Sequence, residues 1–268
     1  MVTPMTSRSD MNIPQKPLEI KKYFSIGLFL TILFASGWFT DFSLTEVFRG
    51  IGETREILSK MFLHTDLGYV KNLLGPLAET IQMSLIGTAI GAVTAVPVAV
   101  FSARNFIKHK LFTGFWRNFL GVFRTIPALV FAAIFASVFG LNSFSGMLAL
   151  SVFTFGLLAK LIYEAMEGID HGAVEALEAS GASQLSILRY AFIPQILPQY
   201  LSFILYAFEI NIRSASILGY VGAGGIGVFY QRNLSFFRYE RIGTIVILTF
   251  VVVLITDAVS AKIREKLV

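Results

Sequence analysis

Six long apolar stretches, each bounded by polar connectors, constrain the fold of this 268-residue chain more than any other feature. A helix that crosses a bilayer needs about 20 mostly apolar residues, and it satisfies its backbone hydrogen bonds without help from water. The stretches cover roughly residues 23–40, 78–103, 119–139, 147–163, 200–220 and 242–261. We therefore predict an all-α membrane protein with six transmembrane helices.

The composition favours the same class of protein. Hydrophobic residues make up 55% of the chain and charged residues only 15%. The net charge is +5, but the basic residues stand in small groups beside the apolar stretches, which indicates a membrane surface rather than nucleic acid as the partner. Because the chain has no cysteine, disulfide bonds and thiolate metal sites are excluded.

The first stretch has an alternative interpretation as a signal peptide. Lys21 and Lys22 precede it, and residues 35–37 have the small side chains of a cleavage site. Trp38 and Phe39 close the stretch in the way that aromatic residues anchor a span at the membrane interface. We expect a retained anchor, which gives an even number of helices with both tails on one side.

Lysine and arginine in the flanks predict the orientation, since cytoplasmic loops carry an excess of them. The N-terminal tail, the connector 104–117 and the C-terminus are rich in both, so we expect these segments and the loop around Glu175 to be cytoplasmic. The outside connector 41–75 mixes basic and acidic residues, which indicates a short amphipathic surface segment. The expected domains are a polar cytoplasmic tail (1–22), a first transmembrane helix with an external connector (23–76), and a transmembrane core (77–268) with a cytoplasmic loop at 164–198.

That cytoplasmic loop has the pattern of a helix, a turn and a second helix. Residues 172–179 are mostly good helix formers, and Gly181 permits the left-handed turn that ends a helix. Ser183 can cap the second helix, which we expect to stop near Pro194 and Pro198 because proline lacks an N–H. The first helix has one apolar side, as in a surface helix that presses on a partner. The alternative is an ordinary solvated connector between two spans.

The stretch 200–220 has polar residues in its middle, where they are costly in hydrocarbon. They are Glu209, Asn211, Arg213, Ser214 and Ser216. Glu209 and Arg213 are four residues apart on one helix face and can form an ion pair. Either this pair is structural, or the stripe lines a water-filled path in which Arg213 offers donors to an oxyanion. We favour the path.

A second set of candidate pathway residues lies near the inner end of the stretch 119–139. It consists of Arg124 and Thr125, which Pro127 follows closely. Proline at this position is expected to kink the helix and free backbone groups for a lumen. Alternatively, Arg124 extends toward the cytoplasm while its stem stays in apolar surroundings.

No catalytic constellation is visible in the sequence. His64, His109 and His171 are far apart, and no phosphate-binding Gly-Lys-Ser/Thr loop occurs. The segment from Gly222 to Gly227 matches the spacing of a dinucleotide fingerprint, but it follows an apolar span rather than a strand. We interpret its glycines as a bend that packs closely on neighbouring helices, and we predict that the chain is not an enzyme and holds no metal.

Five motifs together resemble the permeases of binding-protein-dependent ABC importers, and within them the phosphonate branch. They are Arg124-Thr-Ile-Pro127, Glu175-Ala-Leu-Glu-Ala-Ser-Gly181-Ala-Ser, Ile193-Pro-Gln-Ile-Leu-Pro198, Glu209-Ile-Asn-Ile-Arg213-Ser-Ala and Gly219-Tyr-Val-Gly-Ala-Gly-Gly-Ile-Gly227. The resemblance covers about residues 75–265. Leu177 and Ser180 depart from the general loop pattern of the family and are similar to its phosphonate branch.

The resemblance implies a type I importer fold that works by alternating access. The loop 164–198 would couple the permease to an ATP-binding subunit dimer through Val174, Glu175, Ala176, Leu177, Glu178, Ala179, Gly181 and Ala182. ATP and Mg²⁺ would bind that partner, so no cofactor is expected in this chain. A second permease copy would complete a homodimeric pore in the cytoplasmic (inner) membrane of a bacterium, with both termini cytoplasmic.

An external substrate-binding protein would deliver the small oxyanion, which is a phosphonate, phosphite or phosphate. A scaffold or assembly factor, which would show no transport, stays open as an alternative, and so do two kinds of transporter. One is the permease of an amino acid or betaine importer, since those families share parts of the pattern. The other is an ion-coupled secondary transporter in which Glu209 carries a proton.

Overall fold

The computed structural model describes residues 20–267, and all regular structure in this range is helical. The expected cytoplasmic tail lies outside the described residues except for its last three, which begin the first helix. Contacts divide the chain into two compact units, Met1–Arg55 and Glu56–Val268.

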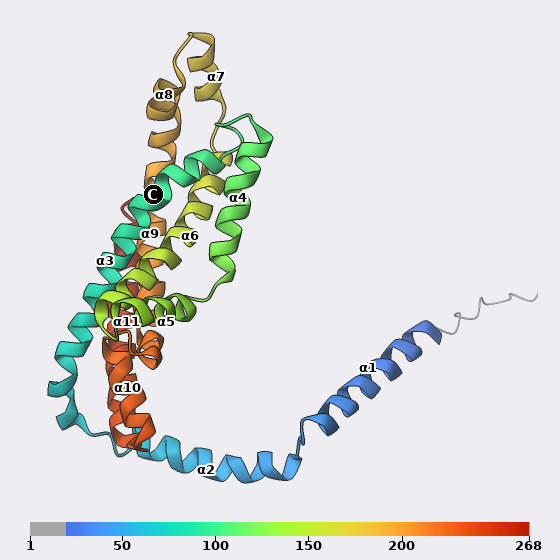
Figure 1. Cartoon of the computed structure of the whole chain (residues 1–268), viewed down its shortest axis with the longest axis vertical. Coiled ribbons are helices and arrows are strands. Elements are labelled where there is room, and N and C mark those ends of the chain that lie inside the picture. Colours follow the sequence, from blue (N-terminus) through green and yellow to red (C-terminus); the bar gives the residue numbers. More distant parts are fainter. Residues whose placement is uncertain (1–19, 268) are drawn as a thin grey trace, which may run out of the picture. The chain divides into compact units, whose positions relative to one another are not determined.

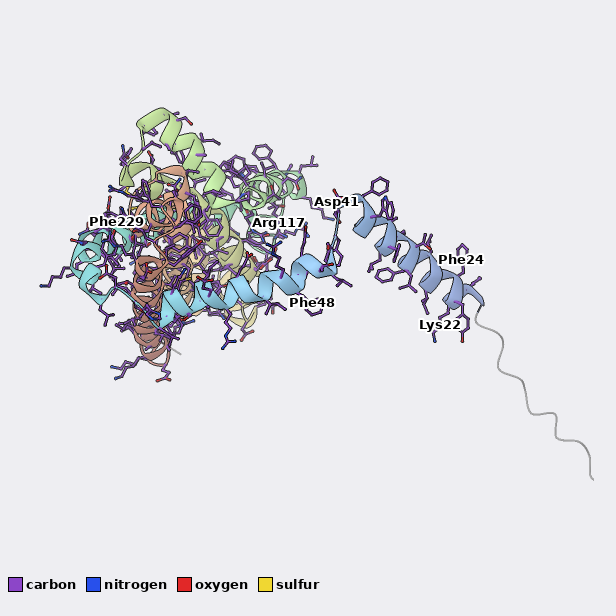
Figure 2. The ribbon with its side chains drawn as sticks, turned by 90° about the horizontal axis from the view of Figure 1, so that it is seen from below. Lys22, Phe24, Asp41, Phe48, Arg117 and Phe229 are labelled. Atoms are coloured by element: carbon purple, nitrogen blue, oxygen red, sulfur yellow. The ribbon has the colours of Figure 1, made fainter. Side chains whose placement is uncertain are left out.

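The first unit contains helix α1 (Ile20–Phe39) and the first part of helix α2 (Leu44–Phe62). Residues Lys21–Phe39 are long and apolar enough to cross a membrane. Figure 2 shows the side chains of α1, among them Phe24, projecting on all sides of the helix, and Phe24 is 71% exposed. The expected amphipathic segment after this span is helix α2, where exposed Phe48 and Ile51 alternate with charged residues.

The second unit is a bundle of four long helices, labelled in Figure 1. They are α3 (Val70–Ser102), α6 (Ser143–Glu167), α9 (Ile193–Leu218) and α11 (Tyr239–Arg264). Each of these helices covers a stretch that was predicted to span. The pair α3 and α6 packs closely because α3 offers Gly87 and Gly91 on one face; a Cβ on Gly91 would lie 2.6 Å from the Cβ of Thr154. Small residues four apart permit such close approach of helices.

The stretch 119–139 is divided between two helices. Helix α4 (Lys110–Thr125) and helix α5 (Ala128–Phe139) meet at an angle of 83°. Ile126 has φ −86° and ψ 121°, an extended conformation that proline imposes on the residue before it. The kink expected at Pro127 is thus a full break. Five described helices can cross a membrane by length and composition, or six if this bent pair forms one span.

The second helix of the loop 164–198 was expected to stop near Pro194 and Pro198, and this expectation is wrong. The short helix α8 (Gln184–Ile187) runs through a π-turn, η2 (Leu188–Phe192), directly into α9. Pro194 lies in the first turn of α9, where the missing N–H costs little, and Pro198 lies further inside. The wider π-turn makes room before the first proline ring, so the chain continues helically.

The end of the bundle opposite α7 (Gly172–Ala179) and α8 is built on glycines (Figure 1). There a short 3₁₀ turn, η3 (Gly219–Val221), leads to helix α10 (Ile226–Ser235), and another, η1 (Leu67–Tyr69), precedes α3. A Cβ on Gly219 would lie 1.9 Å from the carbonyl carbon of Gly227. The Gly222–Gly227 segment therefore bends and packs as the sequence indicated, with no strand before it.

Candidate functional site

The predicted helix–turn–helix loop contains helix α7 over the expected residues, Gly172–Ala179. Gly181 has φ +78° with no atom within 4 Å of a built Cβ, so its conformation, not space, requires glycine. The N–H of Gly181 donates to Glu178 O at 3.0 Å, and that of Ala182 donates to Leu177 O at 3.0 Å. The hydroxyl of Ser183 accepts from Ser186 N at 3.3 Å and caps α8 as predicted.

The two sides of α7 face different surroundings. Val174 is buried and Leu177 partly buried, and both pack on the core of their own chain together with Ala182. The remaining candidate docking residues are exposed. They are Glu175, Ala176, Glu178, Ala179 and Gly181. The apolar side of α7 thus presses on its own bundle, and the side with the glutamates is exposed, with Glu178 Oε1 lying 4.0 Å from Lys108 Nζ.

The predicted ion pair on α9 has a third member. Arg213 Nη2 lies 3.9 Å from Glu209 Oε2, but Arg264 Nη2 lies only 2.5 Å from Glu209 Oε1. The Glu209 side chain is 7% exposed and that of Arg213 is 52% exposed. Arg264 was counted only as a basic flank of the last span, so sequence reasoning missed its role. Arg264 is the closer counter-ion of the buried carboxylate. Arg213 Nε donates to Glu209 O at 3.2 Å, and the Nη groups of Arg213 make no hydrogen bond among the described residues.

Asn211 faces the interior of the bundle. It is fully buried, and its Nδ2 donates to Thr88 Oγ1 at 2.8 Å and to Thr154 Oγ1 at 2.7 Å. These two hydroxyls belong to α3 and α6, so one side chain joins three helices. The structure therefore separates Asn211 from Arg213, although both lie in the polar part of α9.

Arg213 and Ser216 line a hollow of about 320 Å³ between α9, α10 and α11. Tyr230 and Thr249 also contribute to it, and the rest of its lining is apolar. The hydroxyl of Ser216 is buried and has no hydrogen-bond partner among the described residues. Ser214, between these two residues in sequence, is partly buried.

Arg124 and Thr125 are exposed at the end of α4. Thr125 Oγ1 donates to Val122 O at 2.8 Å, and the stem of Arg124 lies beside Gly156 of α6. Within the described chain, no hydrogen bond or ion pair joins Arg124 or Thr125 to the polar residues of α9. The structure thus does not bring the two candidate sets into one site within a single chain.

Asp257 is another residue that sequence reasoning missed. It lies in α11, and its Oδ1 is buried without a hydrogen-bond partner in the described part of the chain. Its signal was visible in the sequence, since Asp257 is the one acid in the stretch 242–261. A carboxylate inside a span is costly enough to mark a candidate functional position.

Known proteins with similar sequences are permeases. The phosphite transport system permease protein PtxC of Stutzerimonas stutzeri is 34% identical over 200 residues, which cover 75% of this chain and 73% of that protein. PhnE2 of Escherichia coli (strain K12), whose name assigns it to a cryptic phosphonate transport system, is 41% identical over 119 residues, 44% of this chain and 98% of that protein. These relatives confirm the expected resemblance.

Solved structures and a family model agree on the fold. The methionine ABC transporter MetNI, solved in inward-facing conformations, has a chain that matches 76% of this one over its whole length, with a TM-score of 0.66 and 20% identity. This likeness confirms the type I importer permease fold. The family model described as the inner membrane component of binding-protein-dependent transport systems matches residues 95–266. The chain belongs to this family of multi-pass membrane permeases.

Proposed function

We propose that this chain is the pore-forming subunit of an ATP-driven importer for phosphonate, phosphite or a related phosphorus oxyanion. Its similarity to permeases named for phosphite and phosphonate transport supports the substrate class. The observation that carries the proposal within the molecule is the state of Arg213. Its charge is only loosely paired, at 3.9 Å, because Arg264 holds the same carboxylate at 2.5 Å.

An arginine in this state suits a phosphorus oxyanion. The guanidinium presents a planar fork of donors that matches phosphate-like oxygens, and its charge persists at all physiological pH values. The unpartnered hydroxyl of Ser216 beside it supplies a further donor. Arg213 and Ser216 are therefore our first candidates for the substrate pathway. Ser214, Asn211, Glu209, Arg124 and Thr125 do not line this hollow and are candidates on the sequence pattern alone.

The exposed side of α7 supports the proposed source of energy. Glu175, Ala176, Glu178 and Ala179 face outward on a helix held at the tip of the bundle, where a separate ATP-binding subunit has access (Figure 1). ATP and Mg²⁺ bind that subunit and act on the permease only through different affinities for its two conformations. A second copy of this chain completes the pore, an external binding protein delivers the anion, and both termini lie in the bacterial cytoplasm.

Uptake into proteoliposomes tests the function. The chain is reconstituted with its ATP-binding subunit and binding protein, and ATP-dependent uptake of methylphosphonate, phosphite and phosphate is compared with that of methionine and glycine betaine. Uptake of a phosphorus oxyanion is expected. Uptake of methionine or betaine alone identifies an amino acid or betaine importer instead, and uptake without any ATP-binding subunit identifies an ion-coupled transporter.

Variants of Arg213 test the site. Arg213→Gln is expected to lower oxyanion uptake by about 10-fold or more, because a positive partner for the anion is lost. Arg213→Lys keeps the charge without the fork and should retain part of the uptake. Arg232→Gln, an exposed arginine at the end of α10, is the matched control and should transport normally. If Arg213→Gln makes the purified complex dissociate, Arg213 is a structural residue.

A further inference from the structure

The segment that carries α7 leaves the bundle beside a junction that the proposed pathway does not use. Arg117 of α4 lies at its centre. Its Nε donates to Ser102 O at 2.9 Å, its Nη2 forms an ion pair with Glu167 Oε1, and its guanidinium lies 4.6 Å from the centre of the Tyr163 ring. Ser102 ends α3, and Glu167 ends α6. One side chain therefore joins α4 to the ends of two other helices.

Glu167 holds the junction from the other side. The same Oε1 that pairs with Arg117 accepts a hydrogen bond from Arg104 N at 2.9 Å. Next to it, Asn105 Nδ2 donates to Met166 O at 2.5 Å. The side chains of Arg117 and Glu167 are only 18% and 30% exposed, so water screens their attraction less than in a surface pair. The connector between α3 and α4 is thus fixed to the last turn of α6.

The contacts of Arg117 and Glu167 form a first clip. A second clip lies three residues later and holds the neck, which is the short segment between α6 and α7. Asp170 N donates to Gln195 Oε1 at 3.0 Å, and Gln195 Nε2 donates back to Asp170 O at 3.3 Å. Asp170 Oδ1 also accepts from Gly172 N at 3.0 Å, at the start of α7. The neck therefore ties α7 to the first turns of α9. Only Gly168 and Ile169 separate Asp170 from Glu167.

These two clips join the base of the segment that carries α7 to α3, α4 and α9. The chain itself connects α7 to α6 and, through α8, to α9. Helix α4 has no such connection, and much of its apolar surface is exposed, for example Leu111, Phe115 and Val122. The Arg117–Glu167 pair is its charged link to α6, and α4 leads through the break at Pro127 into α5.

We propose that Arg117 and Glu167 are positioning residues that make α4 move with α6 when a partner displaces α7. This inference rests on the proposed function, because it assumes that an ATP-binding subunit acts on α7. The residues do not touch the transported anion. They keep the base of the coupling segment rigid, so that a displacement at its tip reaches the helices on both sides of the bundle.

The coupling ratio, uptake per ATP hydrolysed, is the readout that a merely structural role would not change. We would measure methylphosphonate or phosphite uptake and ATP hydrolysis in proteoliposomes with the complete transporter. Glu167→Ala removes both bonds of the carboxylate, and we expect the ratio to fall by about 10-fold, within the usual range of coupling between sites. Glu167→Gln keeps an acceptor oxygen without the charge and should lower the ratio less.

The matched control is Glu164→Ala. Glu164 lies one turn earlier on α6 and, among the residues that the structure describes, its side chain pairs only with Lys160 of the same helix, at 3.2 Å. Its removal should leave the ratio unchanged. The double variant Arg117→Glu with Glu167→Arg restores opposite charges and should recover part of the ratio that either single variant loses.

An unchanged ratio in Glu167→Ala overturns the inference, even if total uptake falls with the amount of folded complex. If that variant does not assemble, Glu167→Gln decides in the same way. The failure of the proposed function is a different result, since the unaltered transporter itself would then show no ATP-dependent uptake of either anion.

Discussion

The two ends of the four-helix bundle are held together by different contacts. At the end with α7, charged and amide side chains reach across to backbone groups, as Arg117 does to Ser102 O and Gln195 does to the backbone N–H and C=O of Asp170. At the end with α10, close backbone contacts add to side-chain bonds such as that from Thr244 Oγ1 to Asp66 O at 2.8 Å: a Cβ on Gly219 would lie 1.9 Å from the carbonyl carbon of Gly227, and one on Gly243 would lie 1.8 Å from Met61 O. Side-chain contacts can be exchanged one at a time, whereas a close-packed backbone cannot adjust without moving whole helices.

One glycine from each end shows the difference between the two ends most directly. Gly181 near α7 stands in open space and is required only for its left-handed conformation. Gly219 has an ordinary helical φ and is required because no space remains for a side chain. We therefore expect the α7 end to be displaced more easily than the α10 end.

The largest effect is expected from Gly219→Val. Its side chain would overlap the backbone of Gly227 and Val228, and overpacking of this kind costs about 3 kcal/mol or more. Thermal unfolding in detergent and the yield of monodisperse protein measure it. Gly121→Ala in α4, where nothing lies within 4 Å, is the control and should be neutral or stabilising by up to about 1 kcal/mol. A stable Gly219→Val protein would show that the α10 end adjusts easily.

Gly181→Val comes next. A β-branched residue at φ +78° costs about 1–2 kcal/mol locally, but no neighbour is displaced. The spans should therefore insert and the protein should remain folded, while uptake is lost and ATP hydrolysis persists. Gly181→Asn tolerates the left-handed conformation and should restore uptake. Normal uptake by the valine variant would count against a coupling role of this turn.

Local signals in the sequence were sufficient for the turn but not for the contacts between helices. Helix α7, the left-handed Gly181 and the cap by Ser183 follow from residues within a few positions of one another, and all three were predicted. The continuous helix through Pro194 was not predicted, because the π-turn that accommodates this proline has no simple residue signature.

Ion pairs between residues far apart in the sequence were also missed by the sequence analysis. Glu209 and Arg213 are four residues apart and were predicted to pair, but the closer partner, Arg264, lies 55 residues away. Arg117 and Glu167 are 50 residues apart, and in the sequence each looks like an ordinary charged residue beside an apolar stretch. Such pairs depend on which helices become neighbours, and the spacing of residues in one chain does not determine this.

Asn211→Ala should have a smaller effect on stability than either glycine variant. It removes two hydrogen bonds between helices, and bonds of this kind inside membranes contribute about 0.6 kcal/mol each on average. Thr88 keeps its own bond to Ser84 O at 2.6 Å, whereas the buried hydroxyl of Thr154 loses its partner among the described residues. A decrease of about 1 kcal/mol in unfolding free energy is expected. If the apparent KM for the oxyanion rises while stability stays unchanged, Asn211 belongs to the pathway instead.

The smallest effect is expected from Lys60→Gln in α2. Its ion pair with Glu56 is short, 2.7 Å, but both side chains are largely exposed, whereas the Arg117–Glu167 pair is shielded. Hydrogen bonding and attraction from Lys60 lower the pKa of Glu56, so the pair contributes above the ordinary pKa of that carboxyl and is lost as the pH falls through the lowered value. Because water screens an exposed pair, thermal unfolding at pH 7 and at about pH 3 should show no resolvable difference between Lys60→Gln and the natural protein. A clear loss of stability at pH 7 would mean that a short distance between the charged atoms, not shielding from water, determines what an ion pair contributes in this protein.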